Sequence, residues 1–190
     1  GAGNTVRFNG DNGVLIAATT TIGNAVLGNA IFDNETLGID LSVEATIGDG
    51  VTANDGCSDP DSGPNGSQNF PVLTSALVGG GVTMIDFDLD SAAGHYRIEF
   101  FSVLAADASG HGEGRTFLAA EEVSVSASCD ETFLAELSFE VATDRLITAT
   151  ATRVDEVQPS GFGGTSEFST AVVVEIADRI FVDRFQQGLD

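Results

Sequence analysis

The sequence contains no lysine and no tryptophan, and its seven basic residues, all arginines, face 29 aspartates and glutamates. The resulting formal net charge of −22 argues against nucleic acid or an anionic membrane surface as a partner, because both would repel the chain. The same charge attracts divalent cations, although it also suits a protein that only has to stay soluble in salty surroundings. No run of about 18 or more apolar residues is present, so we expect no membrane-spanning helix.

Cysteine is scarce too, since the chain has only Cys57 and Cys129, both in polar, turn-like surroundings. In an oxidising, extracellular setting we expect these two to form a disulfide, which would contribute about 4 kcal/mol in the chain-entropy model. Two unpaired thiols are the alternative. The chain has no basic-then-apolar signal peptide and starts inside a repeat, so we expect a fragment or a processed product.

Residues 1–47 carry a repeated Gly-Asn pattern. Residues 3–9 return as residues 23–29, a step of 20 residues. A period of about 20–25 residues with short β-branched runs and Asn/Gly corners predicts a solenoid of stacked rungs. The predicted inward stack is Val6, Val26 and Ile31, and the predicted side-chain ladders pair Asn4 with Asn24 and Asn9 with Asn29.

Two rungs are fewer than the roughly three that a solenoid needs to be stable. We therefore expect the apolar end of the first rung to be covered, either by neighbouring rungs or by an identical subunit.

Oxygen-bearing side chains, separated by glycine and proline, crowd residues 48–71. Turns of this kind can gather several oxygens around a hard cation, and Ca²⁺ takes about 6–8 of them. The spacing is not that of an EF-hand, because Pro60 interrupts it and no glutamate closes the loop. We predict a calcium-binding joint, with a solvated acidic turn as the alternative. The candidate ligands are Asp40, Asp49, Asn54, Asp55, Asp59, Asp61 and Asn65.

A glycine-rich loop at residues 107–114 offers a second, weaker metal candidate in Asp107 and Glu113, with a flexible interstrand loop as the alternative. His111 in this loop could titrate near neutral pH. The chain has one other histidine, His95, and no Ser-His-Asp or Cys-His signature is legible. We therefore expect no enzymatic activity.

From residue 71 the pattern changes to alternating apolar and polar residues. Ile85, Phe87 and Leu89, for example, alternate with aspartates, which predicts antiparallel sheets with one wet face. About seven such strands in about 100 residues predict an immunoglobulin-like sandwich. The expected strands are 72–77, 82–89, 95–102, 116–125, 133–141, 146–153 and 166–176.

The first part of the chain resembles the final rungs of right-handed parallel β-helix surface proteins of bacteria. The motifs that carry this resemblance are Asn-Ala-Ile-Phe-Asp-Asn at 29–34, Leu-Gly-Ile-Asp-Leu at 37–41, Asp-Gly-Val-Thr-Ala-Asn-Asp at 49–55, Gly-Pro-Asn at 63–65 and Gln-Asn-Phe-Pro-Val-Leu at 68–73.

The same family often continues into an immunoglobulin-like module, and similar motifs follow here. They are Tyr-Arg-Ile-Glu-Phe-Phe at 96–101, the run from Gly110 to Leu118, Ile-Thr-Ala-Thr-Ala-Thr at 147–152 and Thr-Ser-Glu-Phe-Ser at 165–169. The tail at 177–190 resembles the short C-terminal Ile-Phe-x-Asp-x-Phe ending of exported bacterial proteins, although an edge strand or docked tail would also fit it.

The sequence thus predicts an all-β protein: β-helix rungs at 1–47, a calcium-binding joint at 48–71, an immunoglobulin-like sandwich at 72–176 and a tail. We expect a secreted or cell-surface structural or adhesive module that contacts neighbouring rungs, identical subunits, surface glycans or proteins. A self-assembling filament subunit and an accessory domain of a polysaccharide-active enzyme are the alternatives.

Overall fold

The chain folds into an all-β protein, in a computed structural model that describes residues 3–44, 48–56 and 62–177. Its one described helix is the short 3₁₀ turn η1 (Pro64–Ser67). The strands are β1 (Thr5–Arg7), β2 (Val14–Ala17), β3 (Ala30–Phe32), β4 (Ile39–Ser42), β5 (Val72–Gly79), β6 (Val82–Asp90), β7 (Gly94–Val103), β8 (Thr116–Val125), β9 (Asp130–Leu137), β10 (Leu146–Val154), β11 (Phe162–Thr165) and β12 (Val172–Ile176).

The first four strands form two small parallel sheets, β1 with β3 and β2 with β4. Partner residues in both sheets are 25 positions apart, as in the pairs Thr5–Ala30 and Val14–Ile39. This spacing lies at the upper end of the predicted period of 20–25 residues, whereas the step of 20 taken from the Gly-Asn echo is wrong. The chain turns after β1 and after β3 follow the same spacing. Phe8 and Asp33, also 25 residues apart, both adopt positive φ angles, of 59° and 56°.

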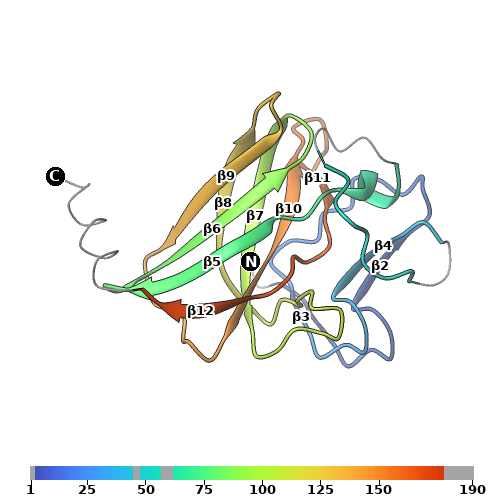
Figure 1. Ribbon diagram of the computed structural model, residues 1–190. Helices are drawn as coiled ribbons and strands as arrows, with labels where there is room; N and C mark the ends of the chain where they lie inside the picture. The colour runs from blue at the N-terminus through green and yellow to red at the C-terminus, as the bar shows by residue number, and fades with distance from the viewer. Residues whose placement is uncertain (1–2, 45–47, 57–61, 178–190) are drawn as a thin grey trace.

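The other strands form one large mixed sheet in the order β8-β7-β10-β12-β5-β6-β9, with β11 paired to β10. Every pairing in it is antiparallel except that of β12 with β5. The sheet curls until its end strands β8 and β9 approach each other, which gives a nearly closed barrel-like shape (Figure 1). In residues 3–44, where the solenoid was predicted, the structure has these two small parallel sheets and no solenoid of stacked rungs is detected.

The alternating pattern places the core of the large sheet as expected. Ile85, Phe87 and Leu89 are buried, and Phe87 packs edge-on against Phe100 of β7. Two expected strands differ in extent, since β9 ends at Leu137 and β12 begins only at Val172. The short β11 was not predicted.

A second core joins the small sheets to the large one. Ile16, Ile31, Ile39 and Leu41 pack with Phe101 and Phe168, which belong to the later part of the chain. Val6 and Val26 pack against the same core, so the inward positions predicted for Val6, Val26 and Ile31 are correct, and Val6 is the partner of Ile31 across the parallel sheet. Figure 1 shows both small sheets on one side of the large sheet.

Gly114 makes this close approach possible. Its backbone exchanges two hydrogen bonds with Ile31, of 2.8 and 2.7 Å. A Cβ atom at this position would lie 2.7 Å from the Phe168 ring and 2.9 Å from the Phe101 ring, so only glycine fits between β3 and the second core.

Candidate functional site

Asparagine ladders run along the stack of small sheets. The backbone N and Nδ2 atoms of Asn4 both donate to Asn29 Oδ1, at 2.9 and 3.1 Å, and Asn9 donates in the same way to Asn34 Oδ1, at 3.2 and 2.8 Å. The predicted ladder pairs, Asn4 with Asn24 and Asn9 with Asn29, are therefore wrong for the same reason as the 20-residue step.

Glu113 continues one ladder from the loop between β7 and β8. Its Oε1 accepts hydrogen bonds from the backbone N and Nδ2 of Asn34, at 3.1 and 2.8 Å. Burial raises the pKa of the Glu113 carboxyl, and the bonds from Asn34 oppose that shift. A carboxylate from this loop thus accepts from Asn34 in the way that Asn34 accepts from Asn9.

Glu167 accepts a backbone hydrogen bond from strand β4. Its Oε1 accepts the backbone N–H of Leu41 at 2.9 Å, and its Oε2 accepts that of Thr52 at 3.0 Å. Burial raises the pKa of Glu167 to about 7 against the lowering effect of these two bonds, and the nearby charge of Asp40 raises it further.

A third buried glutamate, Glu99 on β7, accepts the backbone N–H of Gly28 at 2.7 Å and pairs with Arg97 at 2.9 Å. We call Glu99, Glu113 and Glu167 the glutamate cap, because all three receive backbone N–H groups from the N-terminal segment. Sequence reasoning missed the roles of Glu99 and Glu167, since two acids among 29 carry no distinguishing pattern.

A separate acidic site surrounds Asp40. Asp40 lies on β4 between the core residues Ile39 and Leu41 and is only 1% exposed. Its Oδ2 accepts a hydrogen bond from Asn12 Nδ2 at 2.9 Å, whereas its buried Oδ1 has no hydrogen-bond partner. Burial, followed by the charge of nearby Asp49, raises the pKa of Asp40.

Asn54, Asp55 and Asn65, three other predicted calcium ligands, are engaged in hydrogen bonds with other residues. Asn54 exchanges hydrogen bonds with the Phe70 backbone, and Asn65 accepts from Asn24 and donates to the carbonyls of Asn24 and Thr165, so neither amide is free to face an ion. Asp55 accepts from Asn69 at 3.4 Å. Asp59 and Asp61 lie outside the described residues.

The second metal candidate is not assembled as a pair of free carboxylates. Glu113 belongs to the glutamate cap, while Asp107 Oδ1 accepts the Ser109 N–H within its own turn and Asp107 Oδ2 is buried without a partner. Over residues 3–44, 48–56 and 62–177, no group of three or more His, Cys, Asp or Glu side chains is placed to hold a metal.

The remaining residues that the sequence singled out are the two cysteines and the two histidines. Cys129 is disulfide-bonded, and Cys57, the one other cysteine in the sequence, lies outside the described residues. His111 Nδ1 lies 2.8 Å from the Phe168 carbonyl and its ring packs edge-on against Phe70. His95 Nδ1 lies 2.9 Å from Ser124 Oγ on the surface of the sheet.

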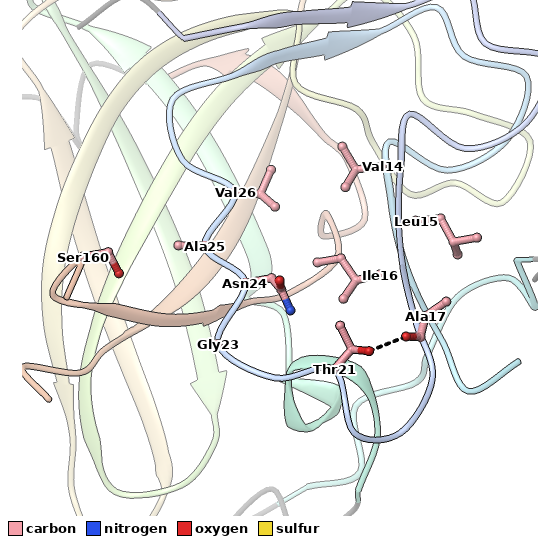
Figure 2. Close-up of a pocket in the computed structure, with 10 residues that line it drawn as sticks. All are labelled: Val14, Leu15, Ile16, Ala17, Thr21, Gly23, Asn24, Ala25, Val26 and Ser160. Carbon is pink, nitrogen blue, oxygen red and sulfur yellow. Dashed lines mark hydrogen bonds between the residues drawn. The ribbon is translucent and has the colours of Figure 1, made fainter. Parts of the chain in front are cut away.

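An open groove of about 600 Å³ lies between β2 and residues 21–26, with Ser160 also in its lining. Figure 2 shows Val14 and Ile16 of β2 pointing across it toward Val26, with Leu15 pointing away and Thr21 bonded to the Ala17 carbonyl at 2.6 Å. Val14, Ile16 and Val26 therefore form its apolar walls.

No protein-family model matches the chain, and no curated protein matches its sequence. No helix in the described part of the chain is long and apolar enough to cross a membrane.

Proposed function

We propose that this chain is a non-enzymatic structural module of a secreted or cell-surface protein, in which the large sheet caps one end of a stack of parallel β-rungs. The disulfide at Cys129 supports an oxidising, extracellular setting. An adhesive role would be exercised through the surface of the large sheet or through the stack that it holds.

The observation that carries the proposal is the bond between Asn34 and Glu113. Asn34 donates to Glu113 with the same two atoms that Asn9 uses to donate to Asn34. Glu167 likewise meets the free edge of β4 at Leu41, and Gly114 meets that of β3 at Ile31. Groups from loops of the large sheet therefore occupy the positions in which a third rung would place its hydrogen-bond acceptors.

The opposite end of the stack is open. In the described chain, β1 and β2 each pair with one strand only, and neither Asn4 Oδ1 nor Asn9 Oδ1 accepts a hydrogen bond. The groove of Figure 2 and the exposed side chain of Phe8 lie on this first rung. An end that offers ladder acceptors fits a preceding rung in parallel register, which brings donors.

This polarity disfavours the filament alternative. Head-to-tail growth needs two free ends, and the glutamate cap covers one of them. If the open ends of two chains met, each would present the acceptors Asn4 Oδ1 and Asn9 Oδ1 to the same acceptors of the other chain, and no ladder bond would form. We therefore assign the stack as terminal rungs of a right-handed parallel β-helix.

The strand order supports an immunoglobulin-like assignment for the large sheet. Strands β5, β6 and β9 form one antiparallel layer, and β8, β7, β10 and β12 form another. These correspond to the A-B-E and C-F-G layers of that fold, with β8 as an added strand beside β7. The parallel pairing of β12 with β5 joins the layers along one side.

Adding a rung tests the proposal. A chain carrying a copy of residues 3–27 ahead of Gly3 places the copied asparagines 25 positions before Asn4 and Asn9. We expect the copy to dock, to resist protease and to raise the melting temperature by about 2–4 °C for each kcal/mol gained. A matched copy with Asn4→Ala and Asn9→Ala should gain less. An unchanged melting temperature with rapid cleavage of the copy would overturn the proposal.

A further inference from the structure

Asp40 is a buried carboxylate that lacks a counter-charge. Its Oδ1 is buried and has no hydrogen-bond partner, and its Oδ2 accepts a bond from Asn12 Nδ2 at 2.9 Å. The backbone N–H of Gly50 is also close enough to oppose the rise of its pKa. The ion pairs in the described chain are Arg97–Glu99, Arg115–Asp33 and Arg145–Asp144, and none of them involves Asp40. Buried charges in proteins are normally paired or bound to a metal.

Among the described residues, the charged groups that act on the Asp40 carboxyl are all negative. After burial, the charge of Asp49 has the largest effect on the pKa of Asp40, and the charge of Asp11 raises that pKa further. Glu167, in the segment after β11, also interacts with Asp40. Like charges brought together at a partly buried site repel strongly when no cation lies between them.

The segment that covers Asp40 is held in place by its own bonds. Thr52 donates its Oγ1 proton to the Leu41 carbonyl at 3.0 Å and its N–H to Glu167 at 3.0 Å. Gly48 lies so close that a Cβ atom there would sit 2.3 Å from Asp40 Oδ2 and 2.2 Å from Asn12 Nδ2. Asp49 follows directly and is exposed, so one side of the site opens to water.

We propose that Asp40 and Asp49 bind a divalent cation of the Ca²⁺ type, with Asp40 Oδ1 and the Asp49 carboxylate as its protein ligands and water completing its shell. Ca²⁺ fits better than Mg²⁺, because it accepts irregular, flexible oxygen coordination. Two carboxylates and an open side predict weak binding, with a Kd in the range of about 10⁻⁴–10⁻³ M that extracellular modules show.

Such an ion would tie the segment around Asp49 to β4 and so fix the cover over the second rung. The site goes beyond the capping function proposed above and does not depend on it, since it involves only groups that the chain already holds together. It also moves the predicted ion away from Asn54, Asp55 and Asn65, toward Asp40 and Asp49.

Calcium titration of the full chain tests this site. We expect one Ca²⁺ bound per chain by calorimetry and a melting temperature that rises with Ca²⁺ after removal of all metal by a chelator. At ten times the Kd the folding equilibrium constant should increase about tenfold. Mg²⁺ at the same concentration should give a smaller shift.

Three variants locate the ion. Asp49→Asn lies on the surface and should weaken Ca²⁺ binding at least tenfold without loss of the fold, and Asp40→Asn should do the same. Asp144→Asn, an exposed acid in an ion pair with Arg145, is the matched control and should bind as the unmodified chain does. Absence of Ca²⁺ binding at about 10 mM, well above the expected Kd, would overturn the proposal. So would binding that is lost in Asp55→Asn but kept in Asp49→Asn.

Discussion

Asn34 and Glu113, 79 positions apart in the chain, are joined by two hydrogen bonds from one amide-bearing residue to one carboxylate oxygen. The bonds repeat those between Asn9 and Asn34, so a side chain of the large sheet ends a ladder that the small sheets begin.

Replacing Glu113 by alanine should destabilise the protein by about 1–3 kcal/mol, because two donors of Asn34 then lose their acceptor in a buried place. Glu113→Gln should cost less, since the amide oxygen can accept both bonds and the buried charge is gone. Denaturant unfolding measures both changes. Glu136→Ala, at an exposed position of β9, is the control and should stay within about 0.5 kcal/mol of the unmodified chain. Equal effects of Glu113→Ala and Glu136→Ala would contradict the ladder role.

Glu167 should make stability depend on pH. Its pKa is raised from 4.5 to about 7 in the folded protein, so the folded state keeps a proton that the unfolded state releases in this window. The free energy of unfolding should therefore fall as pH rises from about 4.5 to about 7, by up to about 3 kcal/mol from this group.

The comparison chain for this pH effect is Glu167→Gln, which cannot titrate. Denaturant unfolding at several pH values, with a chelator present, should give it a flatter pH profile than the unmodified chain. Because both chains carry the same remaining acids, the difference between their profiles isolates Glu167. Parallel profiles would show that this carboxyl does not titrate between these pH values.

Gly114→Ala should destabilise the protein by about 1–3 kcal/mol, because the added methyl group meets the rings of Phe168 and Phe101. Gly163→Ala is the matched control, since its Cβ would have ordinary contact at 3.5 Å with Arg153. Thermal unfolding compares the two variants. An effect of the same size in both would mean that the close approach of Gly114 to the second core is not what limits this position.

The strands of the large sheet could be predicted because alternation is written directly into the sequence. Because apolar residues occupy every second position, the local sequence alone predicts that Ile85, Phe87 and Leu89 face the core, and they are buried. The end of β9 was harder, because Phe139 continues the alternation beyond Leu137 but is exposed.

The step of the stack was mispredicted because two matches compete. The Gly-Asn pair at 23–24 and the pair at 28–29 both echo residues 3–4, and only the second also aligns Asn9 with Asn34. The glutamate cap left no local signal, since its bonds cross between distant segments. The sequence also could not tell that Asn54 and Asn65, predicted as ligands beside Asp40, would spend their amides on backbone partners in other segments.

The span of the cap bonds also bears on how the chain reaches its native state. Leu41 finds its acceptor on Glu167, 126 residues downstream, and Asn34 finds its acceptor 79 residues downstream. Closing loops of this length is entropically slow, so β3 and β4 can complete these bonds only after Glu113 and Glu167 have been synthesised. The strands that come earlier in the chain therefore depend on acceptors that come later.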